Sequence, residues 1–144
     1  MEQCEDNLLE RHFVLIGLQD FYYKYRDLEA KYLEKCIEYC FMDINSLEQM
    51  QRVYYDKEVA QIKKFSEIYS KEEMEKKISK IDKFNGNIPA FKRLAIIFEK
   101  EKDFQKAVEI CEIAITYYRS LDMLQNVNEF KTRKDKLTSK IKLQ

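Results

Sequence analysis

The sequence has only two glycines and one proline among its 144 residues. Hairpins, sandwiches and barrels need turn-forming residues about every 8 to 12 positions, so this scarcity excludes most β architectures. Leu, Ile, Glu, Lys and Gln are abundant instead, and these side chains lose little conformational freedom in a helix. We therefore predict an all-α protein, with one domain spanning residues 1–144.

The sequence also lacks long apolar runs and a disulfide pattern. The longest apolar run, Phe13 to Leu18, is far below the roughly 20 residues that cross a bilayer. Four scattered cysteines do not form a compact pairing pattern, and the first ten residues are acidic where a secretory signal would be basic. These absences predict a cytoplasmic protein with no membrane association and with reduced cysteines.

The formal net charge is zero, which argues against a dedicated nucleic-acid binder. The charge is nevertheless uneven: residues 1–50 carry 5 basic and 11 acidic side chains, residues 51–100 carry 12 and 8, and residues 101–144 carry 9 and 7. We expect an acidic surface at the N-terminal end and a basic one on the last helix.

Apolar spacing and capping signals divide the first half of the chain into four helices. Helices from about Asn7 to Arg26 and Glu29 to Phe41, separated near Asp27, would form an antiparallel hairpin over residues 7–42. Ser46 with Gln49 reads as a capping box that opens a third helix, ending near Tyr69. Ser70 with Glu73 opens a fourth helix, rich in Lys and Glu and therefore expected on the surface. These last two make up residues 43–84.

A short boundary follows at residues 85–89, Asn-Gly-Asn-Ile-Pro. We expect Asn85-Gly86 to supply left-handed backbone angles and Pro89 to stand in the first turn of a new helix. Because the boundary is short and both flanking helices have apolar faces, we do not interpret it as a domain linker.

Two helices after Pro89 carry small and large apolar side chains at regular spacing, with Asp103 as the N-cap of the second. Their pattern resembles the tetratricopeptide repeat, in which two antiparallel helices cross closely at small residues. The matching residues are Phe91, Leu94, Ala95, Phe98, Phe104, Ala107, Cys111 and Ala114. The departures are Cys111, where a larger side chain is usual, and Arg119, where a proline often stands.

A lone repeat cannot bury its apolar face, so it must stack on neighbours. We interpret residues 7–42 as a degenerate hairpin, 88–120 as the tetratricopeptide-like hairpin, and 121–142 as a capping helix that Asp122 with Gln125 would start. The predicted architecture is a short α-solenoid of stacked antiparallel hairpins. The chain also looks like small helical proteins of low-GC Gram-positive bacteria and their phages, through residues 22–27 and 91–98.

The resemblance implies a groove that binds a protein or a peptide, and hence an adaptor or regulatory module. The groove residues it implies are Lys92, Arg93, Ile96 and Glu99, to which we add Tyr23 and Arg26 of the first helix. Some such proteins clamp a C-terminal carboxylate with Lys, Arg and Asn, but Ile96 stands where an asparagine would be wanted. The partner could also be a second copy of this chain.

Three other patterns have two interpretations each. The last helix carries a basic face that could contact nucleic acid, which is the alternative function, or could simply be solvated. Its residues are Lys131, Arg133, Lys134, Lys136, Lys140 and Lys142. Cys36 and Cys40 could offer two thiolates to zinc or pack in the core. His12 lacks a recognisable metal or catalytic partner, so we expect it to pack or lie on the surface.

No catalytic motif, phosphate loop or metal-ligand set is present. The sequence therefore predicts no enzymatic activity and no cofactor.

Overall fold

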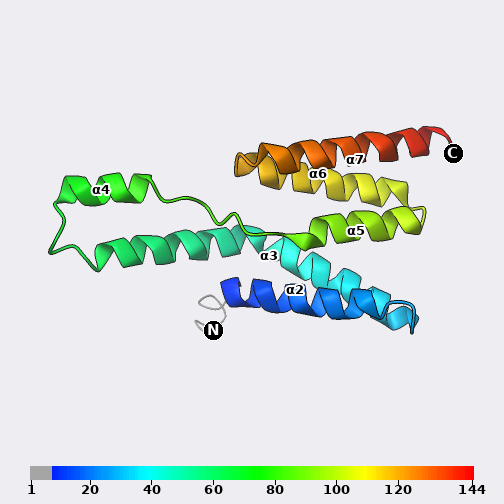
Figure 1. Ribbon diagram of the computed structural model, residues 1–144, viewed down its shortest axis with the longest axis horizontal. Helices are drawn as coiled ribbons and strands as arrows, with labels where there is room; N and C mark the ends of the chain where they lie inside the picture. Colours follow the sequence, from blue (N-terminus) through cyan, green and yellow to red (C-terminus); the bar gives the residue numbers. More distant parts are fainter. Residues whose placement is uncertain (1–7) are drawn as a thin grey trace.

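The computed structural model describes residues 8–144, which form a row of helices with a projecting arm (Figure 1). These residues contain six helices and no strand, so the all-α prediction is confirmed for this part of the chain. The helices are α2 Leu8–Lys24, α3 Ala30–Lys63, α4 Lys71–Ser79, α5 Pro89–Lys100, α6 Phe104–Ser120 and α7 Leu124–Lys142. The first helix was expected to begin at about Asn7, which lies outside the described residues, as does Cys4.

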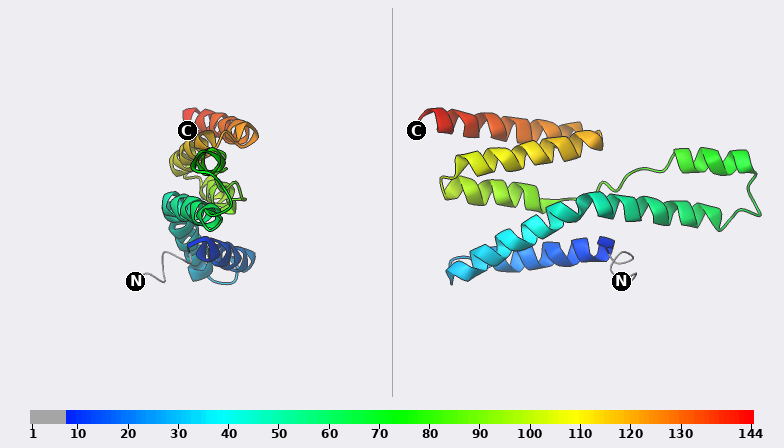
Figure 2. Two further views of the ribbon diagram at one scale, coloured as in Figure 1. Left: turned by 90° about the vertical axis from the view of Figure 1, so that its left-hand side faces the viewer. Right: turned by 180° about the vertical axis from the view of Figure 1, so that it is seen from behind.

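Helix α2 and the first half of α3 form the expected antiparallel hairpin, which makes up one end of the row (Figure 2). The turn between them covers residues 25–28 and therefore includes the break predicted near Asp27. Leu15 and Gln19 of α2 are buried against α3, and the Gln19 side chain donates a hydrogen bond to the backbone oxygen of Tyr39 at 3.2 Å.

The prediction of two helices between residues 29 and 69 was wrong, because α3 runs without interruption from Ala30 to Lys63. Ser46 does not cap a helix. Its hydroxyl donates to the backbone oxygen of Met42 at 2.7 Å, one turn earlier, and accepts from Arg11 of α2 at 3.2 Å. Serine can make this backward bond inside a helix, so its presence alone does not mark a start. The boundary expected at residues 42/43 therefore falls inside α3.

Met50 is the last buried residue of α3. The C-terminal part of α3 pairs with α4 as a projecting arm (Figure 1). The predicted cap of α4 is present, since the Ser70 hydroxyl accepts a hydrogen bond from the Glu73 amide at 3.2 Å. No residue of α4 is buried, in agreement with its expected surface position. Phe65 lies beyond the end of α3 and is 48% exposed.

The segment between α4 and α5 returns along α3 to the body (Figure 1). Gln51 of α3 holds it in place, because its amide donates to the Phe84 oxygen at 2.6 Å and accepts from the Phe84 nitrogen at 3.0 Å. Gly86 does not have a positive φ, so the expected left-handed Asn-Gly turn is absent. A Cβ atom there would overlap the Phe84 ring, so any other residue would require this ring to move.

Helices α5 and α6 form an antiparallel hairpin with small residues buried between large ones. Pro89 stands in the first turn of α5, and the Asp103 carboxylate accepts from the Lys106 amide at 3.2 Å as the N-cap of α6. Lys102, in the connecting turn, has a φ of 61°. The residues matched to the repeat are buried, except Phe104, which is half-buried: Phe91, Leu94, Ala95, Phe98, Ala107, Cys111 and Ala114.

Helix α7 covers α6 and completes the row. It buries Val127, Phe130 and Leu137, which lie on one face of the helix. The predicted cap is absent, because Asp122 adopts a φ of 55° in the turn and Met123 occupies the N-cap position without a side-chain hydrogen bond. An aspartate tolerates this left-handed conformation well, which makes it a turn residue here.

The buried side chains of α3, α5, α6 and α7 form one continuous core. None of the helices described is both long enough and apolar enough to span a membrane.

Candidate functional site

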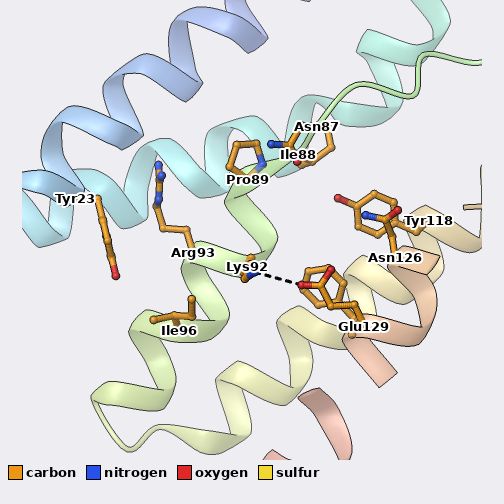
Figure 3. Close-up of a pocket in the computed structure, with 11 residues that line it drawn as sticks. Tyr23, Asn87, Ile88, Pro89, Lys92, Arg93, Ile96, Tyr118, Asn126 and Glu129 are labelled. Carbon is orange, nitrogen blue, oxygen red and sulfur yellow. Dashed lines mark ion pairs between the residues drawn. The ribbon is translucent and has the colours of Figure 1, made fainter. Parts of the chain in front are cut away.

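A cavity of about 380 Å³ opens where the start of α5, the segment before it and the first half of α7 meet α2 (Figure 3). Two of these elements reach the cavity for a local reason. Pro89 starts α5 there, and the turn at Asp122 directs α7 back across α6. The lining residues are Tyr23, Asn87, Ile88, Pro89, Lys92, Arg93, Ile96, Tyr118, Asn126, Glu129 and Phe130.

An ion pair spans the cavity between α5 and α7. Lys92 Nζ lies 3.4 Å from Glu129 Oε1, with 56% and 44% of the two side chains exposed (Figure 3). Exposed pairs of this kind contribute little to stability, about 0 to 1 kcal/mol. Both side chains are therefore available to exchange this contact for one with a ligand.

Arg93 is held much more firmly than Lys92. Its Nη2 atom lies 2.5 Å from Asp20 Oδ1, and its guanidinium is 5.2 Å from the centre of the Tyr23 ring. Only 17% of its side chain is exposed. Arg26 also contacts Tyr23, with its guanidinium 4.1 Å from the ring centre, and donates to the Tyr23 backbone oxygen at 2.7 Å. Two arginines therefore fix the ring that forms one wall.

Amide and phenol groups add hydrogen-bonding capacity to the cavity. Asn87 and Asn126 are both among its lining residues, and Tyr118 presents a phenol at the same end (Figure 3). Burial raises the pKa of Tyr118 to about 12 from an ordinary value of 10.0, so its hydroxyl stays protonated well above neutral pH. With Ile88 and Ile96, the site combines apolar walls with neutral donors and acceptors and one exchangeable ion pair.

The structure brings together four of the six predicted groove residues, namely Tyr23, Lys92, Arg93 and Ile96. Arg26 packs on Tyr23 and does not line the cavity. Glu99 lines a second, adjacent cavity, and its carboxylate pairs with Lys140 at 2.5 Å and Arg133 at 4.0 Å.

Sequence reasoning did not predict the other lining residues, including the polar side chains of Asn87, Tyr118, Asn126 and Glu129. Asn87 lies in the predicted boundary at residues 85–89 and Tyr118 within the predicted hairpin at residues 88–120, while neither Asn126 nor Glu129 belongs to any motif. Only the return of α7 across α6 places Asn126 and Glu129 opposite Lys92, so no spacing along the sequence could have indicated them.

The basic face of α7 is partly neutralised by acidic residues within the protein. Lys134 pairs with Glu112 of α6 at 3.4 Å, while Lys140 and Arg133 share Glu99 of α5. A nucleic-acid surface needs cations free to replace the counterions of phosphate. These pairs favour the interpretation of this face as part of the fold.

The cysteine pair and the histidine both lie in the protein interior. Cys36, Cys40 and Cys111 are free and fully buried. Hydrogen bonding to Cys36 together with burial raises the pKa of Cys40. His12 is buried beside Asp43, which sequence reasoning had not paired with it. Among residues 8–144, no cluster of three or more His, Cys, Asp or Glu side chains could hold a metal ion.

Comparison with known proteins adds no relative. The chain matches no protein-family model, no curated protein and no solved structure.

Proposed function

We propose that this protein is a binding module that holds a peptide segment of another protein in the cavity between α2, α5 and α7. The observation that supports this most directly is the meeting of Tyr23 of α2 with Lys92, Arg93 and Ile96 of α5 in one open cavity. The repeat resemblance implies the three α5 residues as groove residues.

The chemistry of the lining suits an extended peptide. Main-chain amides of a bound peptide need both donors and acceptors, which Asn87 and Asn126 provide. Ile96 and Ile88 offer apolar surface for a side chain, and small-molecule or peptide sites combine such surface with a few polar groups.

The charged residues of the cavity also indicate which peptides should bind best. Lys92 is paired with Glu129 across an exposed contact, whereas Arg93 is already engaged by Asp20. A peptide carboxylate can take the place of Glu129 beside Lys92 without breaking the Arg93 contacts. We therefore expect peptides with an acidic side chain or a C-terminal carboxylate to be preferred. Asn87 and Asn126 would then supply the amides that the groove lacks at Ile96.

The test is selection from a displayed library of extended peptides on the immobilised protein, followed by affinity measurement for the enriched peptides. Lys92→Glu should weaken binding about tenfold or more, since it repels the peptide carboxylate and loses a charge-assisted hydrogen bond of roughly 1.5–3 kcal/mol. Lys131→Glu is the matched control, because Lys131 is an exposed residue of α7 outside the cavity lining. Equal affinity for wild type and Lys92→Glu would refute the assignment of the cavity, as would the absence of any enriched peptide.

Enzymatic and nucleic-acid functions receive less support. The ion pairs of Lys134 and Lys140 occupy part of the basic face, and the cavity lining contains no nucleophile paired with a base. A tetratricopeptide-like stacking of the hairpins remains part of this proposal, since it predicts that the groove side of α5 faces the ligand.

A further inference from the structure

Helix α2 has an exposed apolar face directly opposite the face it buries. At 100° per residue, Glu10, Phe13, Gly17, Phe21 and Lys24 fall within a stripe about 80° wide. Phe13 and Phe21 are 56% and 52% exposed, and Val14 beside them is 61% exposed. The side chains that α2 buries, Leu8, His12, Leu15 and Gln19, lie on the other side.

This face is accessible in the architecture of the body. Helix α2 stands at one end of the row, and α5, α6 and α7 follow one another toward the other end (Figures 1 and 2). A second helix can therefore approach the outer side of α2 without meeting α5, α6 or α7.

Gly17, at the middle of the stripe, is not required by packing within the chain. It has a negative φ, and a Cβ atom placed on it would find nothing within 4 Å. Glycine is a poor residue for a helix interior, where alanine would be more favourable. Its one structural advantage here is that it lets another backbone come close between Phe13 and Phe21.

The distribution of charge about Gly17 identifies the chemistry of the partner. Glu10 lies seven residues before Gly17 and Lys24 seven residues after it, while Phe13 and Phe21 lie four residues before and after. In an antiparallel pair of α2 helices crossing at Gly17, each Glu10 faces Lys24 of the second copy, and each Phe13 faces Phe21 of the second copy. A two-fold interface must be self-complementary in this way, since each contact occurs twice.

We propose that this protein forms a symmetric dimer through the outer face of α2, with the two-fold axis passing beside Gly17. A parallel arrangement would place Glu10 against Glu10 and Lys24 against Lys24, which is repulsive. The charges therefore select the antiparallel arrangement as well as a second copy of the chain.

Sedimentation velocity of the full chain tests the dimer directly. From low micromolar to about 1 mM protein, the range in which weak association registers, the sedimenting mass should rise from 17.5 kDa toward twice that value. Gly17→Lys should weaken the dimer at least tenfold, because two lysines would meet at the axis. Its thermal stability at low concentration should match or exceed that of wild type.

Charge exchange distinguishes this interface from any other. Glu10→Lys and Lys24→Glu should each weaken dimerisation about tenfold, and the double variant should recover wild-type affinity because opposite charges face each other again. Effects on the helix itself would add in the double variant, since both substitutions oppose the helix dipole. A chain that remains monomeric at about 1 mM, a Gly17→Lys variant that dimerises like wild type, or a double variant no better than the single ones would each overturn the proposal.

Discussion

The Nδ1 atom of His12 lies 2.6 Å from Oδ1 of Asp43, and both side chains are almost fully buried. The Nε2 atom of the same imidazole lies 3.3 Å from the backbone oxygen of Asn87. One side chain of α2 thus links the middle of α3 to the segment that leads into α5. Because Asn87 also lines the cavity, this contact connects the first hairpin to the candidate site.

Removal of one partner of this pair should be costly. His12→Ala leaves the Asp43 carboxylate buried without its partner, and breaking a buried pair costs about 3–5 kcal/mol. The free energy of unfolding, measured by urea denaturation, should fall by this order. His12→Leu combined with Asp43→Leu should lose much less, since no buried charge remains. A loss below about 1 kcal/mol for His12→Ala, well under the range for a broken buried pair, would contradict this role.

The crossing of α5 and α6 should not accept a larger side chain. Ala114 is fully buried, so Ala114→Leu must displace neighbours and should cost about 1–3 kcal/mol or more. The matched control is Thr116→Leu, which adds the same side chain at an exposed position of α6 and should change stability by less than about 0.5 kcal/mol. Thermal denaturation of both variants separates the outcomes. Equal effects would mean that the alanine positions do not set the distance between the helices.

The buried cysteines should be unreactive in the folded protein. Cys36, Cys40 and Cys111 have no exposed surface, so a thiol reagent should modify them only when the chain unfolds. A Cys4→Ser background restricts the measurement to these three residues. Rapid modification under native conditions, at a rate independent of stability, would contradict the buried positions.

Burial raises the pKa of Cys111 to about 11 from an ordinary value of 9.0. The neutral thiol is therefore favoured in the folded state, and its contribution to stability is complete below pH 9.0 and decreases as the pH rises toward about 11. Stability of the wild type should consequently fall more steeply over this interval than that of Cys111→Ala. Parallel slopes in chemical denaturation between these pH values would show that the thiol does not titrate on unfolding.

The projecting arm should be the least stable helical part of the described chain. Helix α4 buries no residue, whereas α6 buries seven, Ala107, Val108, Ile110, Cys111, Ala114, Ile115 and Tyr118. Backbone amides that open without exposing apolar surface exchange at low free-energy cost. Hydrogen exchange should therefore be orders of magnitude faster in α4 than in α6. Ser70→Ala, which removes the cap, should accelerate exchange in α4 and leave α6 unchanged.

Much of the helical outline could be predicted because its signals are local. Pro89 and Asp103 start helices through their own backbone angle and carboxylate, and Ser70 caps α4 in the same way. The alternation of small and large residues between Phe91 and Ala114 predicted a close hairpin, because only small side chains permit helices to approach. These features depend on residues within one or two helical turns.

Local signals failed at two side chains that had a second possible role, either with a distant group or in a turn. Ser46 has the spacing of a capping box, yet its hydroxyl bonds to Met42 and to Arg11 of another helix, and α3 continues. Asp122 was expected to cap α7 but forms the turn itself. Sequence spacing does not distinguish these outcomes, because the competing partners belong to the tertiary structure or to the turn geometry.

The sequence by itself determined that the chain is helical, where most helices begin, and which side chains form the close hairpin, since propensity, capping and periodicity act over a few residues. Only the tertiary structure decided that α3 is continuous, that His12 meets Asp43, and that Asn126 and Glu129 stand opposite Lys92. The physical reason is that these relationships join residues about 30 or more positions apart, or depend on which of two available hydrogen bonds forms, and packing selects between them.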